Sequence, residues 1–216
     1  MSLDENLIVE LVRRGVITQT FRRLDPDKKE RIYRAALKLF GKFGYDGLSV
    51  DEVCHEGSIS KGSFFQYFPS KTHLLEFAVL VFDHYLDELV AELRAGDRAA
   101  RAADRLLYLY RSLAVNSRLY PDEERFYLFV TRALDHAAVS LEGIDLERHF
   151  SDYVVEIIER GETSGEIRGD FDSDLTGQLC SLIIAALVRR HYSGRQHRVR
   201  ETGEYLISFL FDGIKA

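Results

Sequence analysis

The chain has 216 residues, of which 46% are hydrophobic and 30% charged, and its formal net charge is −6 at pH 7. This composition is typical of a soluble globular protein with one large domain or two small ones. Cys54 and Cys180 are far apart in the sequence and lack metal-ligand spacing, so neither a disulfide framework nor a metal site is expected.

Two further sequence features bear on where the protein works. No run approaches the roughly 20 apolar residues of a membrane span, and MSLDENLIVE lacks the basic and apolar regions of a signal peptide. We therefore expect no membrane span and a cytoplasmic location. The acidic excess lies beyond residue 75, whereas residues 1–75 are slightly basic. A protein that is acidic overall can still bind DNA through a slightly basic amino-terminal part, because phosphate contacts are local.

Residues 1–26 are expected to form an amino-terminal arm. Apolar residues at helical spacing predict one short helix in it: Leu7, Ile8, Leu11 and Val12. The arm also carries two basic pairs, Arg13-Arg14 and Arg22-Arg23. Three roles are therefore open: an arm that reaches the minor groove of DNA, a helix packed on the next domain, or a mobile tail.

Residues 27–70 have the pattern of three helices. Apolar residues recur at i, i+3, i+4 and i+7 from about residue 27 to 43, after the start signal Asp25-Pro26-Asp27. Ser49, with Glu52 three residues later, predicts a capping box that opens a short second helix. Ser60 caps a third, from about 61 to 67. A short helix, a tight turn and a second short helix, supported by a longer one, indicate a helix-turn-helix unit.

Residues 71–216 are also predicted to be helical throughout. Apolar periodicity places helices at about 71–94, 98–117, 122–141, 145–162, 172–192 and 197–212. No stretch alternates apolar and polar residues long enough for a convincing strand. The fold class is therefore all-α with about nine helices: a three-helix DNA-binding head at 27–70 and a larger helical domain at 71–216.

The segment SISKGSFFQYF, residues 58–68, combines hydroxyl groups, one lysine, one glycine and four aromatic residues. Phe64 and Phe68 are spaced i, i+4, so they should anchor the helix to the core on one side. Gly62 would allow a close approach to a phosphate. The other side is expected to face solvent or DNA with these residues: Lys61, Ser63, Phe65, Gln66 and Tyr67. Ser49 and Ser60 are expected both to cap helices and to contact DNA.

The segment from about residue 29 to 75 resembles the DNA-binding domain of the TetR family of transcriptional regulators. The resemblance lies in AALKLFGKFGYDGLSVDEV and ISKGSFFQYFPSKTHLL. It implies a homodimeric repressor or activator whose head binds a palindromic operator and whose larger domain binds a small effector. It also implies that six residues lie at or near DNA: Ser49, Ser60, Lys61, Gly62, Tyr67 and Lys71.

Two positions depart from the pattern of the family. Phe65 stands where a tyrosine is common, so an apolar contact to a sugar or a thymine methyl group is the most that it can offer. Gly57-Ser58 stands where Ala-Gly is usual. A left-handed conformation at Ser58 would cost roughly 1 kcal/mol, unless Gly57 takes the turn one residue earlier.

The last two predicted helices carry broad apolar surfaces that a monomer could not easily cover. Pairing with a second copy would give a four-helix interface, and GEIRGDFDSDLTGQL resembles the segment that leads into the dimer helices of the family. The expected interface residues are Leu179, Leu182, Ile183, Ala186, Leu206, Phe209 and Leu210.

The middle helices hold aromatic residues and isolated polar groups. These suit an effector pocket with an apolar body, although an ordinary helical core has the same pattern. The candidate lining is Tyr108, Arg111, Phe126, Phe129, His136 and Tyr153. The expected partners are therefore double-stranded operator DNA, a second copy of the chain and a small, partly apolar effector, with no cofactor.

Two rival functions follow from the same sequence. An enzyme is disfavoured, because no HExxH, CxxC or glycine-rich phosphate loop is present. The second alternative is a helix-turn-helix regulator whose carboxyl-terminal domain only dimerises or docks a protein partner. A densely filled middle core would favour it. The sequence does not distinguish repression, the expected mode, from activation.

Overall fold

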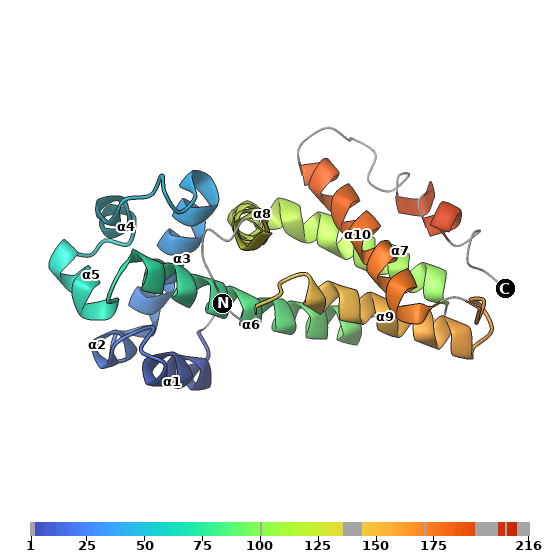
Figure 1. The fold of residues 1–216 in the computed structure, drawn as a ribbon, viewed down its shortest axis with the longest axis horizontal. Helices are drawn as coiled ribbons and strands as arrows, with labels where there is room; N and C mark the ends of the chain where they lie inside the picture. Colours follow the sequence, from blue (N-terminus) through green and yellow to red (C-terminus); the bar gives the residue numbers. More distant parts are fainter. Residues whose placement is uncertain are drawn as a thin grey trace. The chain divides into compact units, whose positions relative to one another are not determined.

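The structure is a computed structural model that describes residues 3–99, 101–135, 144–170, 172–192, 203–205 and 207–210. The described residues hold ten named helices and no β-strand (Figure 1). The prediction of an all-α fold is therefore confirmed. No helix within these ranges is long and apolar enough to cross a membrane.

The arm forms two helices instead of the single one expected, α1 (Glu5–Arg13) and α2 (Gln19–Arg22). Asp4 caps α1 by accepting a hydrogen bond from the backbone N–H of Leu7 at 2.8 Å. Ile8, Leu11 and Phe21 are fully buried. Of the three roles that the sequence left open, the structure has the packed helix.

The three helices of the head are α3 (Pro26–Phe43), α4 (Val50–Glu56) and α5 (Lys61–Tyr67). The side chain of Asp25 caps α3, with proline in the first turn, and the Ser49–Glu52 capping box opens α4. Ser60 caps α5 by accepting a hydrogen bond from the N–H of Ser63 at 3.0 Å. These start signals act within a few residues of the chain, which is why the sequence predicts them well.

The remaining helices match the predicted periodicity. They are α6 (Lys71–Gly96), α7 (Ala102–Leu119), α8 (Pro121–Asp135), α9 (Arg148–Thr163) and α10 (Ser173–Tyr192), followed by helical residues at 203–205 and 207–210. The predicted helices at 122–141 and 197–212 therefore lie partly outside the described residues.

The chain divides into two compact units. Unit 1 is Met1–Tyr85 with Pro121–Ile144, and unit 2 is Leu86–Tyr120 with Asp145–Ala216. The boundary within α6 differs from the predicted division at residue 70. The arm and α8 also belong to unit 1 together with the head, because both pack on the head's helices.

Helix α8 packs on α3 at very short range. A Cβ atom on Gly41 would lie 2.9 Å from the backbone nitrogen of Phe126, so the glycine permits the approach. Next to it, the rings of Phe40 and Phe129 stack with centroids 6.1 Å apart. This packing makes α8 a direct neighbour of the helix that supports α4 and α5.

Unit 2 has its own core, formed by the second part of α6 with α7, α9 and α10. Tyr110, Val154, Ile158 and Ile184 are among its buried residues. On α10, a Cβ atom on Gly177 would lie 2.8 Å from the Cα of Val155, so α10 and α9 are in backbone contact there.

Candidate nucleic-acid interface

The turn between α4 and α5 is made by Ser58. Its φ angle is 52°, in the left-handed region, whereas Gly57 keeps a helical φ of −77°. Of the two possibilities that the sequence left open, the structure has the left-handed turn at Ser58 and not the turn at Gly57. Gly57 still belongs to the last turn of α4, because its N–H donates to the carbonyl of Val53 at 2.8 Å. The strained conformation thus falls on Ser58, at a cost of about 1 kcal/mol.

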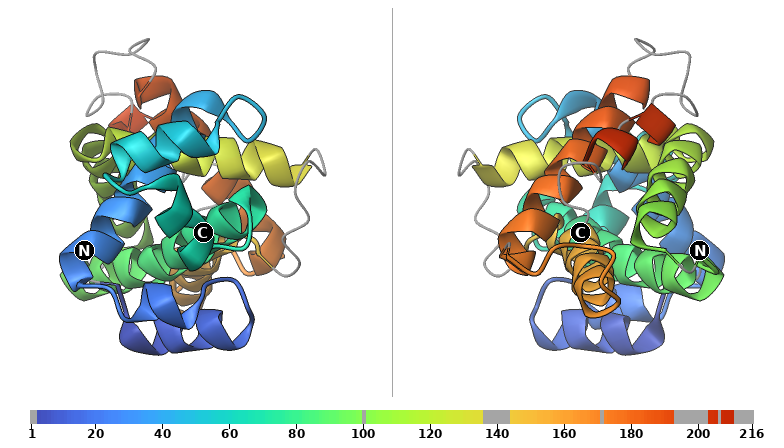
Figure 2. Two further views of the ribbon diagram at one scale, coloured as in Figure 1. Left: turned by 90° about the vertical axis from the view of Figure 1, so that its left-hand side faces the viewer. Right: turned by 90° about the vertical axis from the view of Figure 1, so that its right-hand side faces the viewer.

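Helix α5 has one buried and one exposed side. Phe64 and Phe68 are fully buried, which is the anchoring that their spacing predicts. Gln66 and Phe65 are exposed, the latter by 52%. Further exposed or half-buried residues on or beside this helix are Ser60, Lys61, Gly62 and Ser63. In the left view of Figure 2, α5 lies toward the viewer.

Tyr67 does not belong to the exposed side, contrary to the prediction. Only 4% of it is exposed. Its ring packs edge-on against Phe21, with centroids 6.0 Å apart, and the Nζ of Lys28 lies 5.6 Å from the ring centroid. The reason is α2, which the sequence analysis did not predict and which covers this end of α5.

The Lys61 ammonium group forms an exposed ion pair, so it can exchange its carboxylate partner for another anion. Its Nζ lies 2.9 Å from a carboxylate oxygen of Asp51, and the two side chains are 60% and 69% exposed. An exposed pair of this kind contributes at most about 1 kcal/mol. A DNA phosphate can therefore replace Asp51 at small cost.

The serine hydroxyl groups are already engaged in caps. The Oγ of Ser49 donates to Glu52 at 2.7 Å, and the hydroxyl groups of Ser60 and Ser63 lie 2.9 Å apart. A serine hydroxyl has a single donor. Ser49 would have to give up its bond to Glu52 to donate to a phosphate, whereas one of the Ser60 and Ser63 hydroxyl groups keeps its donor.

Lys71 is held inside unit 1 more firmly than the sequence suggests. Its Nζ donates to the carbonyl groups of Tyr45 at 2.7 Å and Leu48 at 2.9 Å, and it lies 4.3 Å from the centroid of the Tyr45 ring. Two of its three donors thus close the connection between α3 and α4. This role depends on a turn far away in the sequence, so residue pattern alone did not indicate it.

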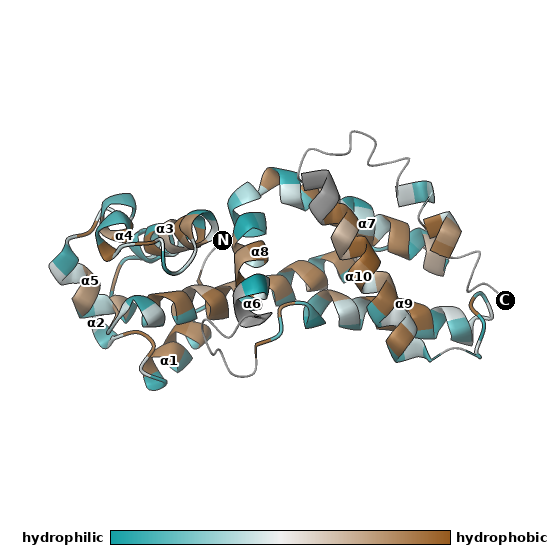
Figure 3. Cartoon of the chain, turned by 45° about the horizontal axis from the view of Figure 1, so that its top comes forward, coloured by the Kyte–Doolittle hydropathy of each residue, from teal (hydrophilic) through white to brown (hydrophobic). Residues whose placement is uncertain are grey.

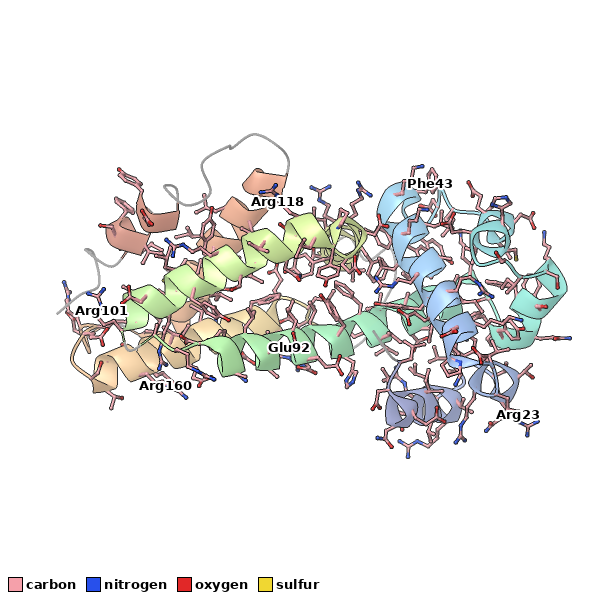
Figure 4. The ribbon with its side chains drawn as sticks, turned by 180° about the vertical axis from the view of Figure 1, so that it is seen from behind. Arg23, Phe43, Glu92, Arg101, Arg118 and Arg160 are labelled. Carbon is pink, nitrogen blue, oxygen red and sulfur yellow. The ribbon has the colours of Figure 1, made fainter. Side chains whose placement is uncertain are left out.

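The basic residues of the arm are mostly paired. Arg22 lies 3.1 Å from Glu5, and Arg14 lies 3.1 Å from Glu76. Arg23 is exposed and has no acidic partner among the described residues. Figure 4 shows its side chain at the surface beyond α2.

Two predicted dimer residues, Leu179 and Leu182, lie in a stripe of exposed leucines on α10 that also includes Leu175. Leu175, Leu179 and Leu182 are 56%, 52% and 50% exposed. Ala186 is also exposed, and the spacing of 4, 3 and 4 residues puts all four on one side of the helix. Hydrophobic residues are frequent in the middle of α10 (Figure 3).

The other predicted dimer residues differ in exposure. Phe209 is 68% exposed, whereas Ile183 and Leu210 are half-buried. Leu206 lies outside the described residues.

The predicted effector residues are not gathered within either compact unit. Phe126 and Phe129 belong to unit 1, whereas Tyr108, Arg111 and Tyr153 belong to unit 2. Phe126 is fully buried. His136 lies outside the described residues.

Two of the predicted effector residues in unit 2 form side-chain hydrogen bonds within that unit. The guanidinium of Arg111 donates to Glu204 at 2.6 Å. The hydroxyl of Tyr153 donates to Asp97 at 3.1 Å, and burial, followed by the charge of Asp97, raises the pKa of this tyrosine.

A small pocket of about 70 Å³ also lies in unit 2. Its lining is Ala102, Arg105, Ile157, Arg160, Gly161, Ser164 and Glu166. None of the predicted effector residues lines it. Its volume is far below the few hundred Å³ that a small-molecule site needs, so the effector prediction gains nothing from it.

Sequence reasoning missed two residues of the interface region, Thr18 and Phe21. Thr18 caps α2, and its hydroxyl also bonds to the end of α5. The available signal was a threonine followed three residues later by a large apolar residue, which is a helix start. The signal is weak because α2 has only four residues.

Comparisons with known proteins agree with this geometry. A sequence model described as "Bacterial regulatory proteins, tetR family" matches residues 32–78. The transcriptional regulator RutR of Escherichia coli K12 is 35% identical over 102 residues, which is 46% of this chain and 46% of that protein. The chain spans less than half the length of the curated relatives it matches.

Solved structures share the fold at low sequence identity. A TetR family regulator from Chloroflexus aurantiacus has a TM-score of 0.64 and 21% identity, over 93% of this chain and 99% of that one. FadR from Bacillus subtilis, in complex with stearoyl-CoA, has a TM-score of 0.61 and 16% identity, over 86% and 98%.

The helix-turn-helix geometry of α4 and α5, the matched profile and the related regulators agree. Residues 32–78, in the amino-terminal unit, therefore form a DNA-binding domain of the kind found in the tetR family of bacterial regulatory proteins.

Proposed function

We propose that the protein is a transcriptional repressor that binds a palindromic operator as a homodimer and is released by a small effector. The observation that carries the proposal is the exposed side of α5. There Lys61 and Gln66 present donors on a helix held from behind by Phe64 and Phe68. A short, firmly anchored helix with such donors fits the major groove of DNA.

The residues of this surface take different parts in the proposal. Gln66 reads a base edge, since a glutamine can pair with adenine through two hydrogen bonds. Lys61 leaves Asp51 for a phosphate, and Gly62 lets the backbone come close to the strand. Phe65 contacts a sugar or a thymine methyl group. Ser60 or Ser63 donates to a phosphate at the start of α5, and Ser49 does so at the start of α4 by exchanging Glu52 for the phosphate.

Tyr67 and Lys71 take lesser parts. The ring of Tyr67 is buried and Lys71 is bonded to two carbonyl groups. Each can offer DNA only what remains free: the edge of the tyrosine and one ammonium donor.

The leucine stripe of α10 supports dimerisation. A row of half-exposed leucines leaves apolar surface in contact with water. In a dimer with a two-fold axis, the stripe of each copy would cover the stripe of the other. A symmetric dimer presents two α5 helices to DNA, so its operator is a palindrome with half-sites about 34 Å apart or a multiple of one turn.

Release by an effector would act as a population shift. A ligand that prefers the conformation unable to bind DNA lowers operator affinity by its differential affinity for the two states. The conformational change would reach the DNA-binding helices by two routes. One is helix α6, and the other is the contact between α3 and α8 at Gly41. FadR, which shares the fold, binds stearoyl-CoA, and a ligand of that kind fits the expected partly apolar effector.

Selection of bound duplexes from a random pool tests the DNA part of the proposal. The expected result is enrichment of one palindrome, with binding that weakens steeply as salt rises. Enrichment of a single non-repeated half-site would contradict the dimer, and no enrichment would contradict operator recognition.

Titration of the selected palindrome with small ligands tests release. Acyl-CoA thioesters of several chain lengths are the first probes, with free coenzyme A as the control. Operator affinity that is unchanged by ligands which bind the protein would favour the alternative, a carboxyl-terminal domain that only dimerises or docks a protein.

A further inference from the structure

The arm bonds directly to the end of helix α5. The backbone N–H of Thr18 donates to the carbonyl of Tyr67 at 3.1 Å, and the Thr18 hydroxyl donates to the carbonyl of Gln66 at 2.6 Å. The last carbonyl groups of any helix lack partners within the helix. In α5, two of them are satisfied by one residue that precedes α3 in the chain.

An aromatic cluster reinforces these hydrogen bonds. Phe21 of α2 is fully buried, and its ring centroid lies 5.1 Å from that of Phe68 and 5.0 Å from that of Phe77. Together with the contact to Tyr67, this ring joins the end of α5 to α6. Close-packed aromatic contacts of this kind resist displacement of either helix.

The arm is itself fixed to unit 1 at other points. Ile8 and Leu11 are fully buried. The carboxylate of Glu5 lies 3.1 Å from Arg22 and 3.7 Å from the buried Lys29. The arm therefore acts as a firm support for α5, and it lies outside residues 32–78 that the family sequence model covers.

We propose that α1 and α2 position the DNA-reading helix, and that Thr18 sets the placement of Gln66 in the groove. The inference rests on the proposed DNA binding. Helix α5 has only seven residues, so a small shift at its carboxyl-terminal end moves Gln66 as well. Base readout needs placement within about 0.5 Å, whereas phosphate attraction tolerates a shift because it is long-ranged. The arm thus governs discrimination between bases more than overall attraction to DNA.

The test compares Thr18→Val with Thr18→Ser. Valine has nearly the same shape but removes the hydroxyl, whereas serine keeps it. The measurement is the ratio of affinities for the selected operator and for the same duplex with one base pair of each half-site changed. We expect Thr18→Val to lower this ratio about 10-fold, the size of one lost base contact. Affinity for a random duplex and its salt dependence should stay the same, and Thr18→Ser should retain the wild-type ratio.

Thr131→Val is the matched control. The Thr131 hydroxyl also donates to a backbone carbonyl in unit 1, that of Tyr127 at 3.0 Å, but it lies within α8. This variant should keep the wild-type ratio. If Thr131→Val and Thr18→Val lowered the affinity ratio equally, the cause would be general destabilisation, and the inference would be overturned.

Two other outcomes are decisive. A folded Thr18→Val variant that discriminates as well as the wild type overturns the positioning role but leaves operator binding intact. A wild-type protein without any base preference overturns the proposed function itself. If Thr18→Val does not fold, Phe21→Leu replaces it, since leucine keeps the site apolar and loses the ring contacts. The same drop in the ratio supports the inference, and an unchanged ratio overturns it.

Discussion

Helices α5 and α10 each have one buried side, but their exposed sides have opposite chemistry. The exposed side of α5 is mainly polar, with Lys61 and Gln66, whereas that of α10 is a row of half-exposed leucines around Leu179 and Leu182. A polar surface is stable in water and can bind a charged polymer reversibly, but exposed leucines gain free energy only when they are covered. The comparison indicates that α5 suits a transient partner and α10 a lasting one.

The largest expected effect comes from making the α10 stripe charged. In the double variant Leu179→Glu with Leu182→Glu, a two-fold interface would bury four unpaired carboxylates, which costs several kcal/mol. We expect the dimer to dissociate at least about 100-fold more readily, as measured by analytical ultracentrifugation. Unit 2 should stay folded, since both side chains already face solvent.

Leu119→Glu is the control for this variant. Leu119 of α7 is 66% exposed, so it is an equally accessible leucine of the same unit. Dissociation by Leu119→Glu but not by the α10 variant would show that the dimer forms through α7 and would contradict the assignment of the stripe.

Two substitutions on α5 separate attraction from base reading. Lys61→Ala should weaken binding to every duplex and lower the slope of log affinity against log salt by about 0.9, the value of one phosphate contact. Gln66→Ala should cost about 1–3 kcal/mol on the operator alone and relax the preference at one base pair. Fluorescence anisotropy over a range of salt concentrations measures both.

Arg13→Gln is the matched control for Lys61→Ala. The Arg13 side chain is 78% exposed and pairs with Glu10, so the substitution removes the same charge from the arm. We expect an unchanged salt slope. An equal change in both variants would mean that only net charge matters, and the special role of α5 would fail.

Gly41→Ala is expected to destabilise unit 1 by about 1–3 kcal/mol. In an open helix the same change would stabilise the protein by up to about 1 kcal/mol, but here the new Cβ meets the backbone of α8 and forces a shift. Denaturant unfolding measures the change.

Gly62→Ala serves as the control for Gly41→Ala. Its Cβ would have ordinary contact only, 3.8 Å from the Ser60 hydroxyl. This variant should be at least as stable as the wild type, yet bind DNA less tightly. Destabilisation by Gly62→Ala of the same size would refute the close-packing explanation.

The smallest effect is expected at Ser58. Ser58→Gly relieves the left-handed strain of about 1 kcal/mol, and part of this gain is offset by the greater freedom of glycine in the unfolded chain. The melting temperature should rise by a few degrees at most. Ser58→Ala keeps the strained backbone and should not raise it, and a rise of equal size in both variants would exclude backbone strain as the cause.

The parts of the interface that the sequence predicted are those with local causes. The Ser49–Glu52 capping box and the Phe64–Phe68 spacing each involve neighbours within four residues, and both are present in the structure. Tyr67 and Lys71 were expected at DNA from the resemblance to the family. Their actual contacts, with Phe21 and with the carbonyl groups of Tyr45 and Leu48, join residues more than 20 positions apart.

By itself, the sequence determined the helical class, the helix starts and the pair of short helices that reads as a DNA-binding unit. Each of these follows from periodicity and capping, which act over one or two helical turns. Only the tertiary structure decided that the arm supports α5 and that α8 packs on α3. These depend on which distant surfaces fit together at Phe21 and Gly41, and packing complementarity is not written in any short stretch of the chain. The structure also decided between the two turns that the sequence left open, at Gly57 or at Ser58.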